Sequence, residues 1–126
     1  MVLKKYAFFI AILYSLSLLI VSLIKFNRLP DVGVDFGDKI FHFLTYGLLT
    51  ILWLYTFLYN FKFNFRHAIF TAAILSIVFG IIIEVLQGSL TSYRAFDGFD
   101  ALANTLGVLI ASLALWGKRN LGVKNL

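Results

Sequence analysis

The chemically versatile side chains of this sequence lie beside its apolar stretches, at spacings that place them on shared helix faces. Asp38, His42 and Tyr46 are each four residues apart, so they form one stripe along a helix. Glu84 and Gln87 are three residues apart and share a face at the end of another predicted helix. An imidazole, a phenol, an amide and two carboxyl groups can therefore meet inside a bundle. Such a set could bind a polar ligand or transfer protons.

A further polar series begins the last predicted helix. Asp97, Asp100 and Asn104 follow one another at intervals of three and four residues, and Arg94 precedes them by three. A guanidinium can bind a phosphate or carboxylate through two hydrogen bonds, so Arg94 could contact an anionic group. The acidic side chains could accept from sugar hydroxyls or hold a hard divalent cation, although the spacing requires no metal. The polar cluster predicted from these patterns has nine members: Asp38, His42, Tyr46, Glu84, Gln87, Arg94, Asp97, Asp100 and Asn104.

Several members of the polar cluster also have a purely structural explanation. Asp38, Asp97 and Asp100 could cap helices, because a carboxylate accepts hydrogen bonds from the free amides of a first turn. Glu84 follows an unbroken apolar run, and ionisable residues inside a span usually face an interior or a cavity. Asn104 could form a hydrogen bond between helices. A wholly structural cluster predicts that substitutions lower stability and abundance without a separate loss of activity.

Four apolar stretches must position these residues. Hydrophobic residues make up 61% of the chain and charged residues 13%, with a mean hydropathy of +0.93. Soluble domains carry about 25% charged residues, so lipid is the more plausible solvent. A membrane-crossing helix needs about 20 mostly apolar residues. The sequence therefore predicts an all-α, four-helix transmembrane bundle in one domain, with helices covering about residues 6–24, 40–61, 68–87 and 99–117.

The first apolar stretch could alternatively belong to a signal peptide, because Lys4 and Lys5 precede it. It is longer than the usual apolar region of about 7–15 residues, and no small-x-small cleavage site follows. We therefore predict that it is retained as a helix.

Two further patterns concern packing. Ala103, Gly107 and Ala111 repeat small residues at intervals of four, which predicts a close approach between helices and makes a dimer through this face possible. The aromatic residues, including Trp53 and Trp116, fit lipid-facing or interfacial positions.

The predicted spans divide the loops into two sets that differ in charge. The amino terminus, the loop around residues 60–67 and the carboxyl terminus contain seven of the eleven basic residues and no acidic residue. The loops around residues 25–39 and 88–100 contain the other four basic residues beside five aspartates. Because lysine and arginine favour the cytoplasmic side, both termini are predicted to lie in the cytoplasm. The polar cluster would then lie toward the outer side.

Composition and motifs exclude several classes of function. The chain has no cysteine, which rules out a thiolate metal site and a cysteine nucleophile. It also lacks a nucleophile elbow, a phosphate-binding loop and an HExxH zinc motif. A net charge of +5 could indicate nucleic-acid binding in a soluble protein, but here the basic residues flank apolar stretches. Nucleic acid is therefore not an expected partner.

Two sequence blocks resemble the VanZ-like family of small bacterial membrane proteins. The first reads D-K-I-F-H-F over residues 38–43 and continues with Tyr46 and Gly47. The second reads E-x-x-Q, then R-x-x-D-x-x-D-x-x-x-N-x-x-G, between Glu84 and Gly107. With the four predicted helices, these blocks cover nearly the whole chain. The resemblance implies a multi-pass protein of the bacterial inner membrane, linked through the family's namesake to teicoplanin resistance; it implies no particular reaction or cofactor.

The favoured interpretation is an envelope protein that binds an anionic lipid-linked or glycolipid ligand through the polar cluster. The alternative is an enzyme acting on a lipid-linked cell-envelope substrate, with Glu84 or His42 as general base or acid. Metal dependence or product formation would distinguish the enzyme from a binding protein. A small multidrug-type exporter is less expected, because such proteins carry an essential carboxylate in the first helix, and residues 6–24 contain no charge.

Overall fold

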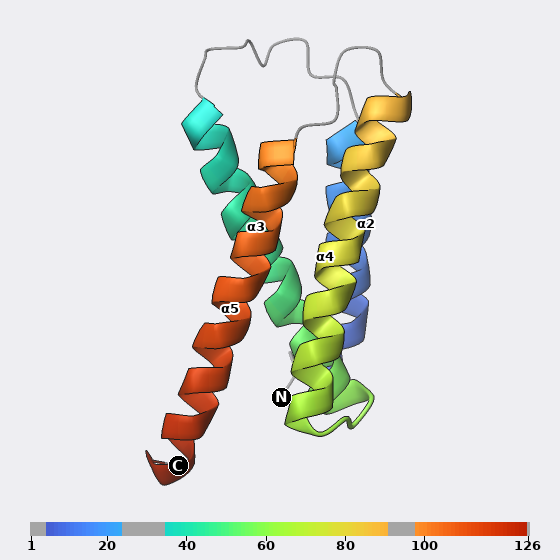
Figure 1. Ribbon diagram of the computed structural model, residues 1–126. Helices are drawn as coiled ribbons and strands as arrows, with labels where there is room; N and C mark the ends of the chain where they lie inside the picture. The colour runs from blue at the N-terminus through green and yellow to red at the C-terminus, as the bar shows by residue number, and fades with distance from the viewer. Residues whose placement is uncertain (1–4, 24–34, 91–97, 126) are drawn as a thin grey trace.

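The chain folds into a bundle of long helices (Figure 1). The computed structural model describes residues 5–23, 35–90 and 98–125, with the backbone alone described for residues 35–39, 87–88, 90, 98–100 and 120–125. Its elements are α2 (Ala7–Leu23), α3 (Asp35–Tyr55), the π-helical turn η1 (Thr56–Asn60), α4 (Phe65–Leu90) and α5 (Gly98–Asn125). The predicted all-α class is therefore confirmed.

Among the described residues, three stretches are long and apolar enough to cross a membrane: Ile40–Asn60, Phe65–Leu86 and Ala101–Arg119. Helix α2 is also apolar, but its described part is shorter, at 17 residues. At 1.5 Å per residue it extends about 26 Å, against about 30 Å for the hydrocarbon core of a bilayer. Length and composition thus make α3, α4 and α5 the membrane-spanning frame of the bundle.

Large apolar side chains cover the outside of the bundle. The exposed fraction is 69% for Leu113, 63% for Leu44 and 60% for Phe9. Continuous apolar surface of this kind would be unfavourable in water but is matched to lipid. The exposed surface and the helix lengths therefore agree that this is a membrane protein.

The helix ends differ from the predicted ones mainly beyond the apolar stretches. Helix α4 begins at Phe65, three residues before its predicted start, and α5 continues to Asn125 rather than ending near residue 117. Lysine and arginine are good helix formers, so a helix can continue after its sequence has become too polar for lipid. Hydropathy located the apolar part of each helix and missed these polar extensions.

The beginning of α2, the connection between α3 and α4 and the end of α5 lie at one end of the bundle (Figure 1). The basic residues Lys5, Lys62, Arg66, Lys118 and Arg119 therefore belong to the same end. The beginnings of α3 and α5 lie at the opposite end. The two ends thus differ in charge as the loop composition predicted, and the cytoplasmic location of the basic end stays a prediction.

Helix α3 contacts each of the other long helices and is the centre of the bundle. Its closest neighbour is α5: a Cβ added at Gly47 would lie 3.4 Å from the Gly107 carbonyl oxygen and 3.7 Å from the Ala111 Cβ. A Cβ added at Gly107 would overlap the Phe43 carbonyl group. The predicted small-residue face is therefore used for close packing, but its partner is α3 of the same chain. Helix α3 accordingly occupies the face that was considered for a dimer.

Two hydrogen bonds attach α2 to α3. The Tyr14 hydroxyl donates to the Thr45 carbonyl oxygen at 2.8 Å, and the Trp53 indole N–H donates to the Ser15 hydroxyl at 3.1 Å. The prediction of a lipid-facing or interfacial Trp53 was therefore wrong. An indole has both an apolar body and one donor, so sequence does not distinguish an interfacial tryptophan from one packed between helices.

Asparagine side chains provide acceptors for two helix beginnings at the basic end. Asn64 Oδ1 accepts from the His67 amide at 2.8 Å, which makes Asn64 the N-cap of α4. Asn60 Oδ1 accepts from the Phe8 amide at 2.8 Å, so a residue of η1 caps the distant first turn of α2. Between them, Lys62 has a φ of 60° and reverses the chain.

We expect Asn64→Ala to lower the free energy of unfolding by about 1 kcal/mol, because the His67 amide loses its acceptor. Thermal unfolding in a mild detergent measures this change. Asn64→Asp is the matched control, since an aspartate can accept the same hydrogen bond and should stay close to wild type. Equal destabilisation by alanine and aspartate would contradict a capping role for Asn64.

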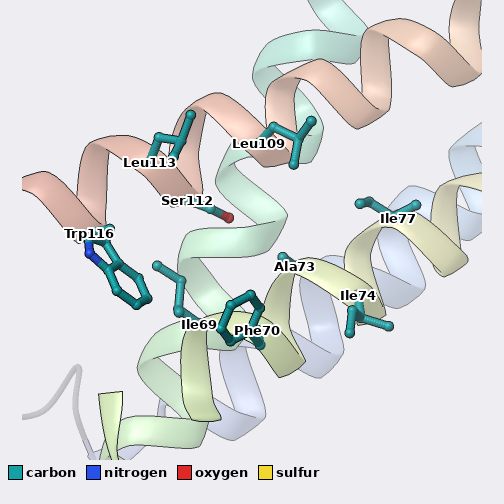
Figure 2. A pocket seen from close by; sticks show the side chains of 9 residues that line it. All are labelled: Ile69, Phe70, Ala73, Ile74, Ile77, Leu109, Ser112, Leu113 and Trp116. Carbon is teal, nitrogen blue, oxygen red and sulfur yellow. The ribbon is translucent and has the colours of Figure 1, made fainter. Parts of the chain in front are cut away.

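An apolar groove lies between residues 69–77 of α4 and residues 109–116 of α5 (Figure 2). Its volume is about 520 Å³. Ile69 and Phe70 on one wall lie near Trp116 on the other, as Figure 2 shows. Apart from the Ser112 hydroxyl and the Trp116 indole N–H, hydrocarbon lines this groove.

Candidate functional site

The best-defined polar contact of the candidate site joins α3 to α5. His42 Nδ1 lies 3.0 Å from Asn104 Oδ1, so a histidine protonated at Nδ1 donates a hydrogen bond to the amide oxygen. Asn104 is almost completely buried, with 2% of its surface exposed. The structure thus joins residues 62 positions apart that were predicted to converge.

Tyr46 follows His42 by one helical turn on the same face of α3. Like Asn104, Tyr46 is buried. It meets α4 at Gly80: a Cβ added at Gly80 would lie 3.0 Å from Tyr46 Cε2 and 3.2 Å from Asn104 Nδ2. The missing side chain at residue 80 therefore lets the phenol ring and the amide lie against α4. Three helices meet at this point.

Glu84 follows Gly80 by one helical turn and has no exposed surface. It lies within the apolar stretch Phe65–Leu86, close to its end. Its carboxyl group interacts electrostatically with the phenol of Tyr46. An ionisable residue in this setting is expensive to bury, which makes a functional role the default hypothesis. We call His42, Tyr46, Glu84 and Asn104 the inner cluster.

The Asn104 amide nitrogen is buried and has no hydrogen-bond partner among the residues that the structure describes. Its oxygen is already used by His42. A buried donor left in this way costs about 1–3 kcal/mol, so it is a position at which a ligand oxygen would be stabilising. The inner cluster can therefore offer an amide donor and a carboxyl acceptor to one polar molecule.

The other five predicted members of the polar cluster are described less fully. Asp38 and Asp100 lie in the first turns of α3 and α5, and Gln87 lies in the last turn of α4, which places their backbones at the inner-cluster end of the bundle. Arg94 and Asp97 lie outside the described residues. The role of all nine as ligand-binding residues stays a prediction.

No group of three potential metal-binding His, Cys, Asp or Glu side chains occurs among the described residues. The acidic residues considered for a divalent cation include Asp38, Asp97 and Asp100, whose side chains lie outside that set.

The sequence patterns missed two residues beside the inner cluster. Gly80 follows Ser76 and precedes Glu84 at intervals of four, and this series of two small residues and an acid could have indicated the packed face of α4. Tyr14 of α2 also interacts electrostatically with Tyr46, and its hydroxyl reaches the backbone of α3. Helix α2 contains no charged residue or histidine at a spacing of three or four from Tyr14 that would have marked it.

Comparisons with known proteins identify the family of this chain. An uncharacterized protein of Schizosaccharomyces pombe is 34% identical over 94 residues, an alignment that covers 73% of this chain and 56% of the relative. The chain therefore spans little more than half the length of that protein. No solved structure gives a significant match. Residues 3–119 match the family VanZ/LLP1, which includes the whole inner cluster. The chain belongs to the VanZ/LLP1 family.

Proposed function

We propose that the protein binds the polar headgroup of a membrane lipid or lipid-linked sugar through its inner cluster. The observation that carries this proposal is the pair of buried polar side chains Glu84 and Asn104 inside an apolar bundle, with Asn104 lying against α4 one helical turn before Glu84. A carboxyl group accepts from hydroxyls, and the Asn104 amide nitrogen donates to a headgroup oxygen. The Glu84 carboxyl and the Asn104 amide are therefore complementary to a headgroup that carries hydroxyl groups.

The surroundings of the inner cluster favour a lipid over a water-soluble ligand. The cluster lies at the ends of stretches that can cross a membrane, at the depth where headgroups meet hydrocarbon. The bundle also presents apolar side chains such as Leu44 and Leu106 to its surroundings near this level. A molecule that reaches the inner cluster laterally must pass through lipid.

The proposal that the ligand is anionic rests on Arg94, which lies three residues before Asp97 in the sequence. A guanidinium in the outer connection could bind a headgroup phosphate while the inner cluster binds its hydroxyls. A phosphatidylglycerol headgroup combines both features and is a suitable probe. We further propose that the protein lies in an inner membrane with this site outward, where a bound lipid-linked precursor would be protected from teicoplanin.

The proposal predicts that the wild-type protein retains phosphatidylglycerol in preference to phosphatidylcholine and to phosphatidic acid, neither of which has an alcohol hydroxyl in its headgroup. Asn104→Leu should reduce this retention about tenfold, equivalent to 1.4 kcal/mol. The variant should still fold, because hydrogen bonds between membrane helices contribute only about 0.6 kcal/mol on average. Native mass spectrometry of protein released from mixed micelles measures the bound fraction.

Ser15→Ala is the control, since it removes the acceptor of the Trp53 hydrogen bond, which lies away from the inner cluster. Its lipid retention should equal that of wild type. Equal retention of the three lipids by the wild-type protein would contradict headgroup recognition. A matched loss in both variants would indicate that bundle stability, rather than the inner cluster, determines retention.

A further inference from the structure

We infer that the apolar groove between α4 and α5 binds one acyl chain of the lipid whose headgroup reaches the inner cluster. This inference rests on the proposed function and specifies its ligand as an amphiphile with a chain lying along the bundle. The groove has a volume of about 520 Å³ and is bounded by residues 69–77 and 109–116 (Figure 2).

The groove lies between α4 and α5, the two helices that also carry Glu84 and Asn104 of the inner cluster. Ile77, at one end of the groove, is three residues from Gly80, which lies against Asn104. Leu109 on the opposite wall is five residues from Asn104. A lipid whose headgroup contacts Asn104 could therefore place an acyl chain in this groove. A headgroup without an acyl chain could not fill it.

The distance from the inner cluster to the far end of the groove matches a chain rather than a compact apolar group. Asn104 and Trp116 are twelve residues apart on α5, which corresponds to about 18 Å along the helix axis. Half of a bilayer's hydrocarbon core is about 15 Å thick. At the far end, the Trp116 ring contacts Phe70 across the groove, with ring centroids 6.2 Å apart. An extended acyl chain with its head at Asn104 would pass the middle of the bilayer before it reached this aromatic contact.

The composition and exposure of the walls favour an acyl chain over a second copy of the protein. Ile74 and Leu113 on opposite walls are 60% and 69% exposed, so the groove opens directly to the surrounding lipid. The small residues that would let another helix approach closely, Gly107 and Ala111, are packed against α3. The groove walls carry mostly branched and aromatic side chains, with the small residues Ala73 and Ser112 on opposite walls, and this relief fits around a flexible chain.

Photocrosslinking tests this inference. The probe is phosphatidylglycerol with a diazirine in the middle of one acyl chain, added to vesicles of phosphatidylglycerol and phosphatidylcholine containing the full-length protein. Labelled peptides from wild type should be concentrated in residues 69–77 and 109–116. Ala73→Leu and Ser112→Leu fill the groove from opposite walls, and each should reduce this labelling about tenfold, because chain methylenes lose their apolar contacts.

Ala114→Leu is the matched control, because it adds the same bulk to an exposed position of α5 that does not line the groove. It should label as wild type does. Labelling spread evenly over all exposed helix faces, or crosslinks between two copies at the groove, would overturn the inference while leaving the headgroup preference intact. Equal groove labelling by a diazirine phosphatidylcholine would instead count against the proposed headgroup recognition.

Discussion

Gly107→Ala should be the most disruptive single-methyl substitution in the bundle. Its Cβ would overlap the Phe43 carbonyl oxygen and lie 2.9 Å from the Phe43 carbonyl carbon, both of which are backbone atoms of a helix. Backbone cannot move aside as a flexible side chain can, so α3 and α5 would have to separate. Overpacking of this kind costs about 1–3 kcal/mol or more, and we expect a loss at the upper end of that range or above it.

Gly117→Ala provides the comparison on the same helix, since a Cβ at that position meets nothing within 4 Å. It removes a glycine from a helix, so it should leave stability unchanged or raise it by up to about 1 kcal/mol. Unfolding of both variants in mixed detergent micelles, followed by tryptophan fluorescence, measures the difference. Similar stabilities for the two variants would show that α3 and α5 do not pack closely at Gly107.

Glu84→Gln should preserve the bundle and remove its ligand binding. Glutamine has nearly the volume of glutamate and keeps an acceptor oxygen, so the packing around Gly80 should be unaffected. Hydrogen bonds to a charged group are worth about 1.5–3 kcal/mol, so phosphatidylglycerol retention should fall about tenfold or more. Membrane abundance should stay equal to that of wild type, because glutamine fills nearly the same volume as glutamate.

The same variant tests the proposed phenotype. A teicoplanin-sensitive host that expresses the wild-type protein should be protected, and Glu84→Gln at matched membrane levels should give no protection. Reduced abundance of the variant, in step with lost protection, would point to a structural role for Glu84. Equal protection by both proteins would show that the carboxyl group of Glu84 is not needed for teicoplanin resistance. A wild-type protein that does not protect would contradict the link to teicoplanin.

The parts of the fold that depend on one helix at a time could be predicted from the sequence. Apolar length located the membrane-spanning stretches, and helical spacing placed His42 above Tyr46 on one face. The convergence of these residues with Asn104 was also predicted, and the hydrogen bond between His42 and Asn104 is present. The helical period carries this information because polar residues in a span usually face the bundle interior.

The parts that depend on pairs of helices could not be predicted in the same way. The repeat through Gly107 indicates a close approach but does not specify α3 of the same chain as the partner. Gly80 is needed for packing because the Tyr46 ring and the Asn104 amide lie against it, and these two side chains belong to two other helices. Trp53 could satisfy its indole N–H at an interface or against Ser15, and local sequence favours neither.

The hydrogen bond from the Phe8 amide to Asn60 has a consequence for the synthesis of the protein. Helix α2 is complete in the growing chain long before Asn60 has been added. Until then, the first turn of α2 must find other acceptors for its free amides, in water or among lipid headgroups. Addition of η1 supplies the missing acceptor and joins the start of α2 to the end of α3. The Phe8 amide therefore gains its side-chain acceptor only once synthesis has reached Asn60, so the first turn of α2 is capped after α3 has been added.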